Sequence, residues 1–520
     1  MIRKLYFAAF MLTSVMPLAA QETYEIAEVG TQDLNGTARY VGMGGAMEAL
    51  GADISTISTN PAGLGLFRKS QFVGTLGLVS QSGEDSWSSA DKTKVSFDQI
   101  GFVYSSRTSQ TGYLCFGFNY HKSRNFSQLL SVADRLQGAS QSKLTYEKFR
   151  WGLIQDANSG AYTQADMLYH EGLYDTNLLY NDGSFNTDAY AFDGDNYLFK
   201  RGNTGYISEF DINLSGNIDN RVYLGMTIGI HDVNYRGHSL YSEQLQANPY
   251  GLATASLEDS RNIDGTGVDI KAGVIFRPIE ESPFRLGLYI NSPTFYSLRS
   301  TNMTTLLLND QFYGDHNPHA GDFEYELRTP WKFGVSAGHT VSNYLALGAT
   351  FEYADYSSTD ARIKGERGYN WYYDEYWSNS ESDNAMNEHV KQTLKGVATV
   401  KVGAEVKPDP SFAIRAGYNY VSPMYKHDAV RGFYENGSPV YSDGTYYSST
   451  TEYINWKATH RLTLGLGVNL DKNWKLDLAY QYSTQKGQFL PFTGSDHNLP
   501  FDVEVKNNRN QWMLTAGYSF

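Results

Sequence analysis

The sequence predicts an all-β fold, namely a 14-stranded antiparallel transmembrane β-barrel. Three observations lead to this prediction. Many segments alternate apolar residues with polar or very small ones, as strands with one lipid-facing side do. The connections between these segments alternate between short and long. The chain also has 40 tyrosines and 49 glycines in 520 residues, yet a mean hydropathy of −0.44, which is typical of a barrel that meets lipid on one face only.

Residues 1–20 are expected to be a signal peptide, because Arg3 and Lys4 precede a short apolar run that ends in small residues. That run is too short to span a bilayer as a helix. Cys115 is the only cysteine, which excludes an intramolecular disulfide and a cysteine-based zinc site. The net charge of −14 disfavours nucleic acid as a partner.

Residues 21–69 precede the first strand and are expected to form a periplasmic hatch inside the barrel. A barrel of fourteen strands leaves an aqueous lumen unless something fills it. The stretch from Ala38 to Phe67 has six glycines, which let the backbone pass close to the wall, and the NPAGLG sequence indicates a tight turn. It contains no Gly-Lys-Ser/Thr phosphate loop, and it breaks the dinucleotide pattern.

Residues 70–520 are expected to form the barrel itself. In residues 473–483 the apolar positions from Trp474 to Tyr482 share one face, and the positions between them are polar or small. The same alternation predicts fourteen strands, at residues 70–81, 95–106, 111–121, 205–217, 220–235, 262–277, 284–297, 322–339, 343–357, 392–407, 411–424, 455–470, 473–486 and 508–520.

The joins between these strands predict the orientation of the barrel. Seven long joins, of which 122–204 is the largest, alternate with six short joins such as NIDNR and KPDPS. An even number of strands with long loops outside and short turns inside places both termini on the periplasmic side. The last strand ends in Phe520 and must pair with the first, because lipid tolerates no open sheet edge.

The segment TARYVGMGGAMEALGADISTISTNPAGLGLF resembles the amino-terminal hatch of the FadL/TodX/OMPP1 family of outer-membrane transport proteins. The resemblance implies an outer-membrane barrel of a Gram-negative bacterium, plugged by this hatch, with hydrophobic molecules passing through a lateral gap at an inward kink of the third strand. In that strand Gly117 is the candidate for the kink. An aromatic last residue resembles the signal read by the barrel assembly machinery, which Phe520 would provide. The positions that match the hatch, and to which a gating role is carried over, are Arg39, Gly42, Gly44, Gly45, Asp53, Asn60, Pro61 and Ala62.

The long loop 122–204 is expected to hold local structure. The segment FSQLLSVADRLQG predicts a helix that Ser127 caps and Gly138 ends, and residues 162–175 predict a second. Apolar residues on one stripe of the first helix would form an outer capture groove for a hydrophobic ligand; the alternative is that the two helices pack on each other. The stripe consists of Phe126, Leu129, Leu130 and Leu136.

No metal site or cofactor is expected, although two segments raise the question. The acidic stretch between Asp156 and Asp195 contains FDGDN, which favours either a calcium site or a solvated acidic surface. His316 and His319 in another outer loop are either haem or zinc ligands or simply exposed. The chain shows no nucleophile elbow, HExxH pair or Cys–His arrangement, so no enzyme activity is predicted.

The function predicted is passive uptake of small hydrophobic molecules, such as long-chain fatty acids, by capture at outer loops, binding in the lumen and hatch-gated release. The expected partners are that ligand and outer-membrane lipid. Three alternatives remain open: a cargo-binding shuttle of type IX secretion, a haem-binding receptor, and a structural or adhesin barrel without transport.

Overall fold

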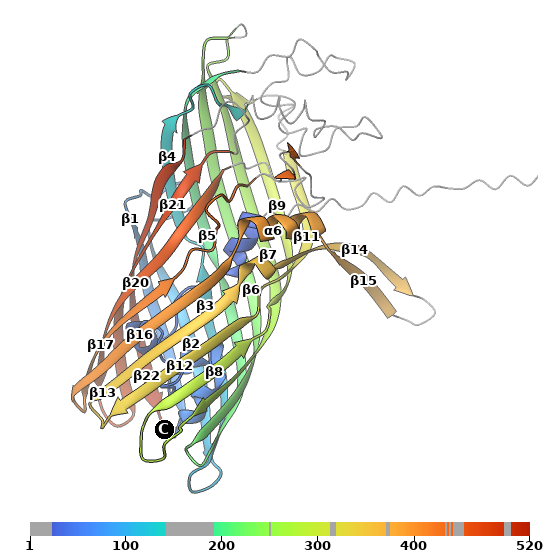
Figure 1. Ribbon diagram of the computed structural model, residues 1–520. Coiled ribbons are helices and arrows are strands. Elements are labelled where there is room, and N and C mark those ends of the chain that lie inside the picture. The colour runs from blue at the N-terminus through green and yellow to red at the C-terminus, as the bar shows by residue number, and fades with distance from the viewer. Residues whose placement is uncertain are drawn as a thin grey trace, which may run out of the picture.

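Within the described residues, fourteen antiparallel strands form a closed barrel wall in the computed structural model (Figure 1). The structure describes residues 23–141, 192–248, 251–312, 319–370, 375–431, 434–435, 438–439, 452–492 and 501–520. The strands of the wall follow one another in chain order: β1 (Gln71–Ser82), β2 (Thr93–Arg107), β3 (Tyr113–Asn125), β5 (Gly194–Ile218), β6 (Val222–Leu245), β7 (Thr254–Phe276), β8 (Arg285–Asn291), β12 (Lys332–Val341), β13 (Leu345–Asp355), β16 (Gly396–Asp409), β17 (Phe412–Val421), β20 (Tyr453–Asn469), β21 (Trp474–Leu490) and β22 (Val503–Ser519).

The wall closes where the first strand pairs with the last. β1 and β22 are antiparallel neighbours from Gln71↔Ser519 to Ser82↔Asn508, and the amide of Phe520 donates to the carbonyl of Ser70 at 3.0 Å. The 14-stranded antiparallel barrel predicted from the sequence is confirmed, and each predicted strand overlaps the wall.

Further elements extend the barrel at the end with the long loops. β9 pairs with both β7 and β11 and so continues the wall above β8 and β12. β14 and β15 form a hairpin that projects sideways from the barrel (Figure 1). The bounds of these elements are β4 (Gln128–Arg135), β9 (Phe295–Leu308), β10 (Gln311–Phe312), β11 (His319–Arg328), η3 (Tyr356–Ser358), β14 (Asp360–Asn370), β15 (Glu375–Ser382), α6 (Asn384–Thr393), β18 (Tyr434–Glu435) and β19 (Ser438–Pro439).

The helix predicted from Phe126 to Gly138 is wrong, because most of this segment forms strand β4. Its backbone pairs with β5 from Gln128↔Asn203 to Arg135↔Asn196. The long strand β5 extends above the membrane part of the wall and offers a free edge there. Pairing with that edge satisfies the backbone of β4 over its whole length, which outweighs the weak local preference for a helix.

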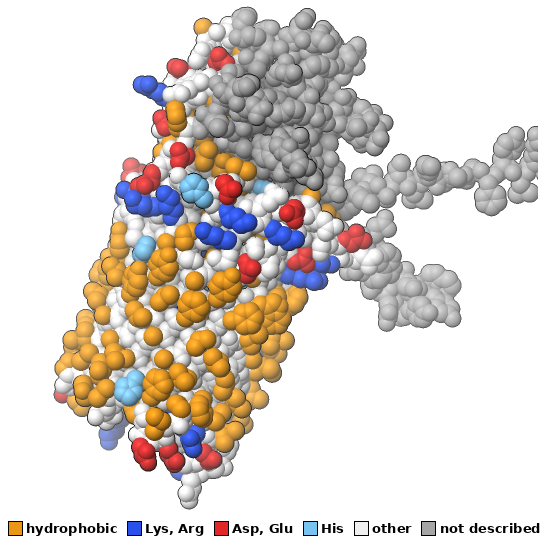
Figure 2. Space-filling view, in the orientation of Figure 1, with side chains coloured by type: hydrophobic (Ala, Val, Ile, Leu, Met, Phe, Trp, Pro, Cys, Tyr) orange, Lys and Arg blue, Asp and Glu red, His pale blue; other side chains and the backbone are white. Residues whose placement is uncertain are grey.

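The outer surface of the barrel carries a hydrophobic band. On the face shown in Figure 2, apolar side chains cover the wall, and charged side chains border them at both ends. In β20 the side chains of Leu462, Leu464 and Leu466 are exposed, whereas Thr463 between them is buried against the lumen. Such a band is what a transmembrane barrel presents to lipid, so the wall lies in an outer membrane. None of the described helices is both long and apolar enough to cross a bilayer.

The first part of the described chain lies inside the barrel. This N-terminal segment (residues 23–69) contains α1 (Thr23–Gly30), α2 (Ala38–Gly42), η1 (Ile54–Ser58) and η2 (Pro61–Leu66). Most of its side chains are buried. α1 lies in the outer half, where Thr23 Oγ1 is 2.7 Å from His389 Nδ1 of α6. The segment therefore extends from the periplasmic end, where the hatch was expected, into the outer half of the lumen.

Candidate functional site

The N-terminal segment packs against glycines on the inner face of the wall. A Cβ atom added to Gly403 or Gly417 would collide with the backbone of Met43 and Gly44, and Gly42 lies against Gly465. Gly44 itself has a φ of +64°, a conformation that residues with a side chain rarely adopt. The glycines of the GMGG sequence and those of the wall thus allow two backbones to approach each other closely.

Asp53 fixes the internal shape of the segment. Its carboxylate caps η1 by accepting from the Ser55 amide at 3.0 Å, and it accepts from the Thr37 hydroxyl at 2.9 Å. Thr37 in turn caps α2 by accepting from the Tyr40 amide at 3.1 Å. Asp53 therefore ties the starts of two helices together.

The Asn60–Pro61–Ala62 turn docks the segment onto β6 and β7. Asn60 caps η2 by accepting from the Ala62 amide at 3.2 Å, and its side-chain amide donates to the Glu48 carbonyl at 3.0 Å. Ala62 is fully buried in a small cluster with Tyr223 and Ile275 of the wall. The turn is a packing contact between the segment and the wall.

Two ion pairs attach the segment to the wall. Arg39 binds Glu405 of β16 through two nitrogens, at 3.0 and 3.3 Å. Burial disfavours the charge of Arg39, but Glu405 more than compensates and raises the pKa of the guanidinium. Glu48 is fully buried and accepts from Lys401 Nζ at 2.8 Å and from Thr350 at 2.7 Å. Both pairs lie inside the barrel, where charges separated from their partners are costly.

A third attachment is Asp33, which faces three arginines from three different strands. Arg124 of β3 donates at 3.2 Å, and the guanidinium nitrogens of Arg461 and Arg509 lie at 3.6 and 3.9 Å. Burial alone would raise the pKa of Asp33, but the three cations overcome it and lower the pKa to about 2. Asp33 was not singled out in the sequence, because a lone aspartate carries no local sign of distant arginines.

The segment also covers a free edge of the wall. β2 and β3 pair only up to Gln99↔His121, and the register of β3 against β5 shifts between Lys122 and Arg124. Past that point the N-terminal segment bonds to β3 in place of β2. The amide of Asp33 donates to the Ser123 carbonyl at 2.8 Å, and Asn35 donates to the Lys122 carbonyl at 2.9 Å.

The predicted kink is therefore not at Gly117. This residue pairs with Val103 on one side and with Asn213 on the other, without interruption. A Cβ atom there would collide with Leu64 of the N-terminal segment. Gly117 makes room for the segment, and the strand departs from its neighbour only above His121.

A cavity lies in the lumen between the N-terminal segment and the wall. It encloses about 200 Å³ and is lined by both apolar and charged side chains. Phe126, Met424 and Trp456 contribute apolar surface. The lining contains four carboxylates but six cationic side chains, which are Arg124, Lys332, Lys401, Lys457, Arg461 and Arg509. Cationic side chains therefore outnumber carboxylates in the lining, even with Lys401 neutralised by Glu48 behind it, and apolar surface lies in the same space.

The apolar residues predicted to capture ligand at the outer loop are buried. Phe126, Leu130 and Leu136 belong to the large hydrophobic cluster that also contains Ile26 of α1, and Leu129 is buried as well. Of the four, Phe126 reaches the cavity. They pack against α1 and the wall in the outer half of the barrel, which is neither the exposed groove nor the packing of two helices on each other that the sequence suggested.

Some predictions fall outside the described residues, namely the signal peptide, the second helix at 162–175, most of the acidic stretch from Asp156 and the side chains of His316 and His319. FDGDN (residues 192–196) is described: Gly194 begins β5, so the segment enters a strand, and its aspartates belong to neither of the two groups of described residues that could hold an ion. Ligation by haem, zinc or calcium at these places remains a hypothesis.

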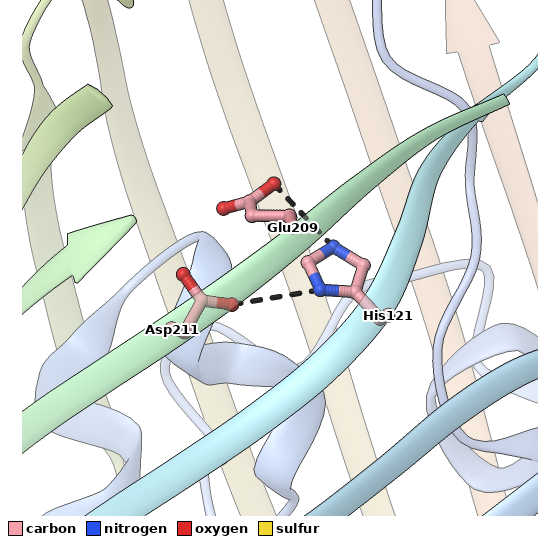
Figure 3. Close-up of side chains that lie close together, drawn as sticks. All are labelled: His121, Glu209 and Asp211. Atoms are coloured by element: carbon pink, nitrogen blue, oxygen red, sulfur yellow. Dashed lines mark ion pairs between the residues drawn. The ribbon is translucent and has the colours of Figure 1, made fainter. Parts of the chain in front are cut away.

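A cluster that the sequence analysis missed lies on the inner wall. His121 of β3 faces Glu209 and Asp211 of β5 (Figure 3). A signal was present: acidic residues at alternate positions of a predicted transmembrane strand point into the lumen together, and a carboxylate there is rarely without a partner. The second group, formed by Glu209, His231 and Asp269, required knowledge of which strands are neighbours.

Comparison with known proteins shows a similarity of fold. No family model matches the chain, and no curated protein matches it. The solved structure of a Pseudomonas aeruginosa FadL homologue is 13% identical, with 94% of this chain and 100% of that chain covered and a TM-score of 0.53. The Ralstonia pickettii toluene transporter TbuX is 11% identical, with coverages of 94% and 99% and a TM-score of 0.49. The Pseudomonas putida toluene transporter TodX is 12% identical, with coverages of 94% and 99% and a TM-score of 0.46.

The first of these similarities extends over nearly the whole of both chains. With a TM-score of 0.53, this chain has the fold of a FadL homologue.

Proposed function

We propose that the protein is an outer-membrane channel for passive uptake of small hydrophobic molecules that carry an anionic group. The observation that carries this proposal is the lumen cavity, which combines apolar walls with an excess of cationic side chains. Apolar ligand surface leaving water contributes about 25 cal/mol per Å², and the cations select the group attached to it. The fold shared with a FadL homologue and the hatch-like sequence of the N-terminal segment support the same function.

The size of the cavity limits the ligand that it holds without rearrangement. An apolar cavity of roughly 150 Å³ accommodates benzene, and the lumen cavity encloses about 200 Å³. A substituted aromatic ring therefore fits the cavity as it stands. A long-chain fatty acid would extend beyond it and would have to displace part of the N-terminal segment.

Asp33 gives the proposed release step a chemical basis. Its carboxylate already occupies the site among Arg124, Arg461 and Arg509 that suits an anion. An arriving carboxylate would compete with Asp33 for these guanidinium groups, because arginine binds both in the same way. Loss of this attachment would weaken the bonds that Asp33 and Asn35 make to the free edge of β3.

The same edge is the proposed exit. Residues 93–97 of β2 pair with β1 alone, and Lys122, Arg124 and Asn125 of β3 pair with β5 alone, while Asp98 and Ser123 lie at register shifts and pair with no strand. Lys122 and Ser96 bridge the gap with a side-chain bond of 3.0 Å. When the segment moves away, the wall is held there by side chains and not by a backbone ladder, which favours lateral release above His121.

Calorimetry on the purified barrel in detergent tests this function. We compare 4-butylbenzoate with the neutral 4-butylbenzyl alcohol, which has the same apolar body. The anion should bind at least about tenfold more tightly, a difference of about 1.4 kcal/mol. Arg461→Gln should remove most of this preference, whereas Arg221→Gln, a half-exposed arginine away from the cavity, should leave it unchanged.

Two results would count against the proposal. Equal affinity for both compounds would show that the cationic residues do not select the ligand. Binding of neither compound would remove the support for uptake.

Co-purification of a polypeptide in place of a small molecule would favour the cargo-binding shuttle, for which the projecting β14–β15 hairpin (Figure 1) offers a surface.

A further inference from the structure

Three ionisable side chains from two strands meet on the inner wall, above the η2 turn. Glu209 and Asp211 occupy alternate positions of β5 and so face the lumen together, and His121 of β3 lies opposite them (Figure 3). Glu209 and Asp211 are fully buried, and His121 is 6% exposed. One donor atom from each lies within 4.8 Å of the others.

The neighbouring strands add a second histidine, a third carboxylate and one lysine. His231 of β6 is fully buried, and Asp269 and Lys271 of β7 are nearly so. With neutral histidines, three carboxylates and one ammonium leave two uncompensated negative charges. A buried charge without a partner is costly, and one divalent cation would balance these two.

Two carboxylate oxygens have no hydrogen-bond partner. They are Glu209 Oε2 and Asp211 Oδ2, and both point toward His121. Glu209 Oε2 lies 3.6 Å from His121 Nε2, and Asp211 Oδ2 lies 3.5 Å from His121 Nδ1. Both distances are too long for good hydrogen bonds. One ligand atom of each of the three residues lies within 4.8 Å of the other two, so a modest shift of the side chains would bring all three onto one ion.

The surrounding residues hold the three ligands in place. Lys271 Nζ binds the other oxygen of Glu209 at 2.6 Å and Asp211 Oδ1 at 3.4 Å. The side-chain amide of Asn119 donates to His121 Nδ1 at 3.2 Å and so fixes the orientation of the ring. Supporting bonds of this kind are typical around metal ligands.

We propose that His121, Glu209 and Asp211 form a binding site for a divalent transition-metal ion, with zinc as the reference ion. One imidazole nitrogen and two carboxylate oxygens suit zinc or manganese. His121 and Glu209 also line the lumen cavity, so an ion reaches the site from there, and a water molecule from the cavity completes the coordination. This inference does not depend on the proposed uptake function.

The position of the site gives the ion a structural consequence. His121 is the last residue of β3 that pairs with β2, and Glu209 and Asp211 belong to the strand on its other side. A bound ion would tie β3 to β5 at the point where β3 leaves β2. It would thereby stabilise the free edge that the N-terminal segment covers.

The test uses the full-length protein, purified with EDTA and then equilibrated with zinc chloride at about pH 7.5. We expect one zinc ion per chain by mass spectrometry of metals and a higher melting temperature with zinc, because a ligand that binds the folded state stabilises it. Asp211→Asn and His121→Gln should each weaken zinc binding by about tenfold or more. Asp98→Asn is the matched control, since Asp98 is a buried carboxylate of the lumen that also has an unpartnered oxygen.

X-ray absorption at the zinc edge of the wild-type protein keeps the test independent of variant folding. It should show one nitrogen and a majority of oxygen donors at about 2.0–2.2 Å, without sulfur. The proposal is overturned if zinc binds no more tightly to wild type than to Asp211→Asn. It is equally overturned if the wild type binds no zinc and its stability instead depends on pH between about 5 and 7, because protonated histidines then balance the charge.

Discussion

Asp33 shows how much one residue of the N-terminal segment contributes. Its pKa is lowered from 3.8 to about 2 in the folded protein, so the folded state binds its proton less readily than the unfolded chain does. The stabilisation is fully present above about pH 4 and is lost as the pH falls through about 2. The shift corresponds to about 2 kcal/mol of the free energy of unfolding.

We therefore expect Asp33→Asn to lower the free energy of unfolding by about 2 kcal/mol at neutral pH. Urea unfolding in lipid vesicles measures this. The difference between variant and wild type should shrink progressively below about pH 4. Asp91→Asn, an exposed residue in the loop after β1, serves as the control and should change nothing. A variant as stable as the wild type would mean that the contacts of Asp33 with the three arginines contribute nothing to the free energy of unfolding.

A glycine of the wall allows a second test at the scale of one residue. Valine at Gly417 would collide with Gly44 and Met43, and the backbone on both sides leaves no room for adjustment. We expect Gly417→Val to displace the N-terminal segment and to raise single-channel conductance in planar bilayers, with overpacking costing about 1–3 kcal/mol. Gly74→Val is the matched change, since nothing lies within 4 Å of a Cβ at Gly74, and its conductance should equal that of the wild type.

At the scale of elements, the positions of the strands could be predicted from the sequence. Pairings between segments that are separated by a long connection could not. The alternation of Leu462, Thr463 and Leu464 is visible within a few residues because lipid and lumen lie on opposite sides of every strand. β4 was mistaken for a helix because its decisive partner, β5, follows it only after a long connection. Asn60 and Asp53 were recognised from a local motif, whereas Asp33, His121 and Glu209 depend on neighbours in distant strands.

The lipid face of β20 provides a test at this scale. Leu464 lies within the strand and Leu470 just beyond its end, and the two are equally exposed, at 60% and 61%. Leu464→Arg should destabilise the folded barrel in vesicles by about 2–4 kcal/mol, whereas Leu470→Arg near the interface should cost about 0–1 kcal/mol. Similar costs for both variants would place the hydrophobic core of the bilayer elsewhere on the wall.

For the whole molecule, the N-terminal segment decides whether the barrel is open. A wall of fourteen strands encloses an aqueous lumen when nothing fills it. We expect deletion of residues 21–66 to produce a folded but leaky pore, with a large conductance in planar bilayers. Heat-modified migration on gels checks that the shortened barrel still folds. An unchanged conductance would show that the wall and outer loops close the lumen by themselves.

The pairing of β1 with β22 has a consequence for biogenesis. β22 follows every other strand of the wall in the chain, and its partner β1 begins directly after the N-terminal segment. The wall therefore stays open along one seam until β22 reaches β1. The N-terminal segment is already present during that interval, and its buried ion pairs with β16 form deep inside the finished cylinder. Its entry into the lumen is then a step of assembly that precedes pairing of β1 with β22. If that step were delayed, the barrel would close with the segment outside and with water in the lumen.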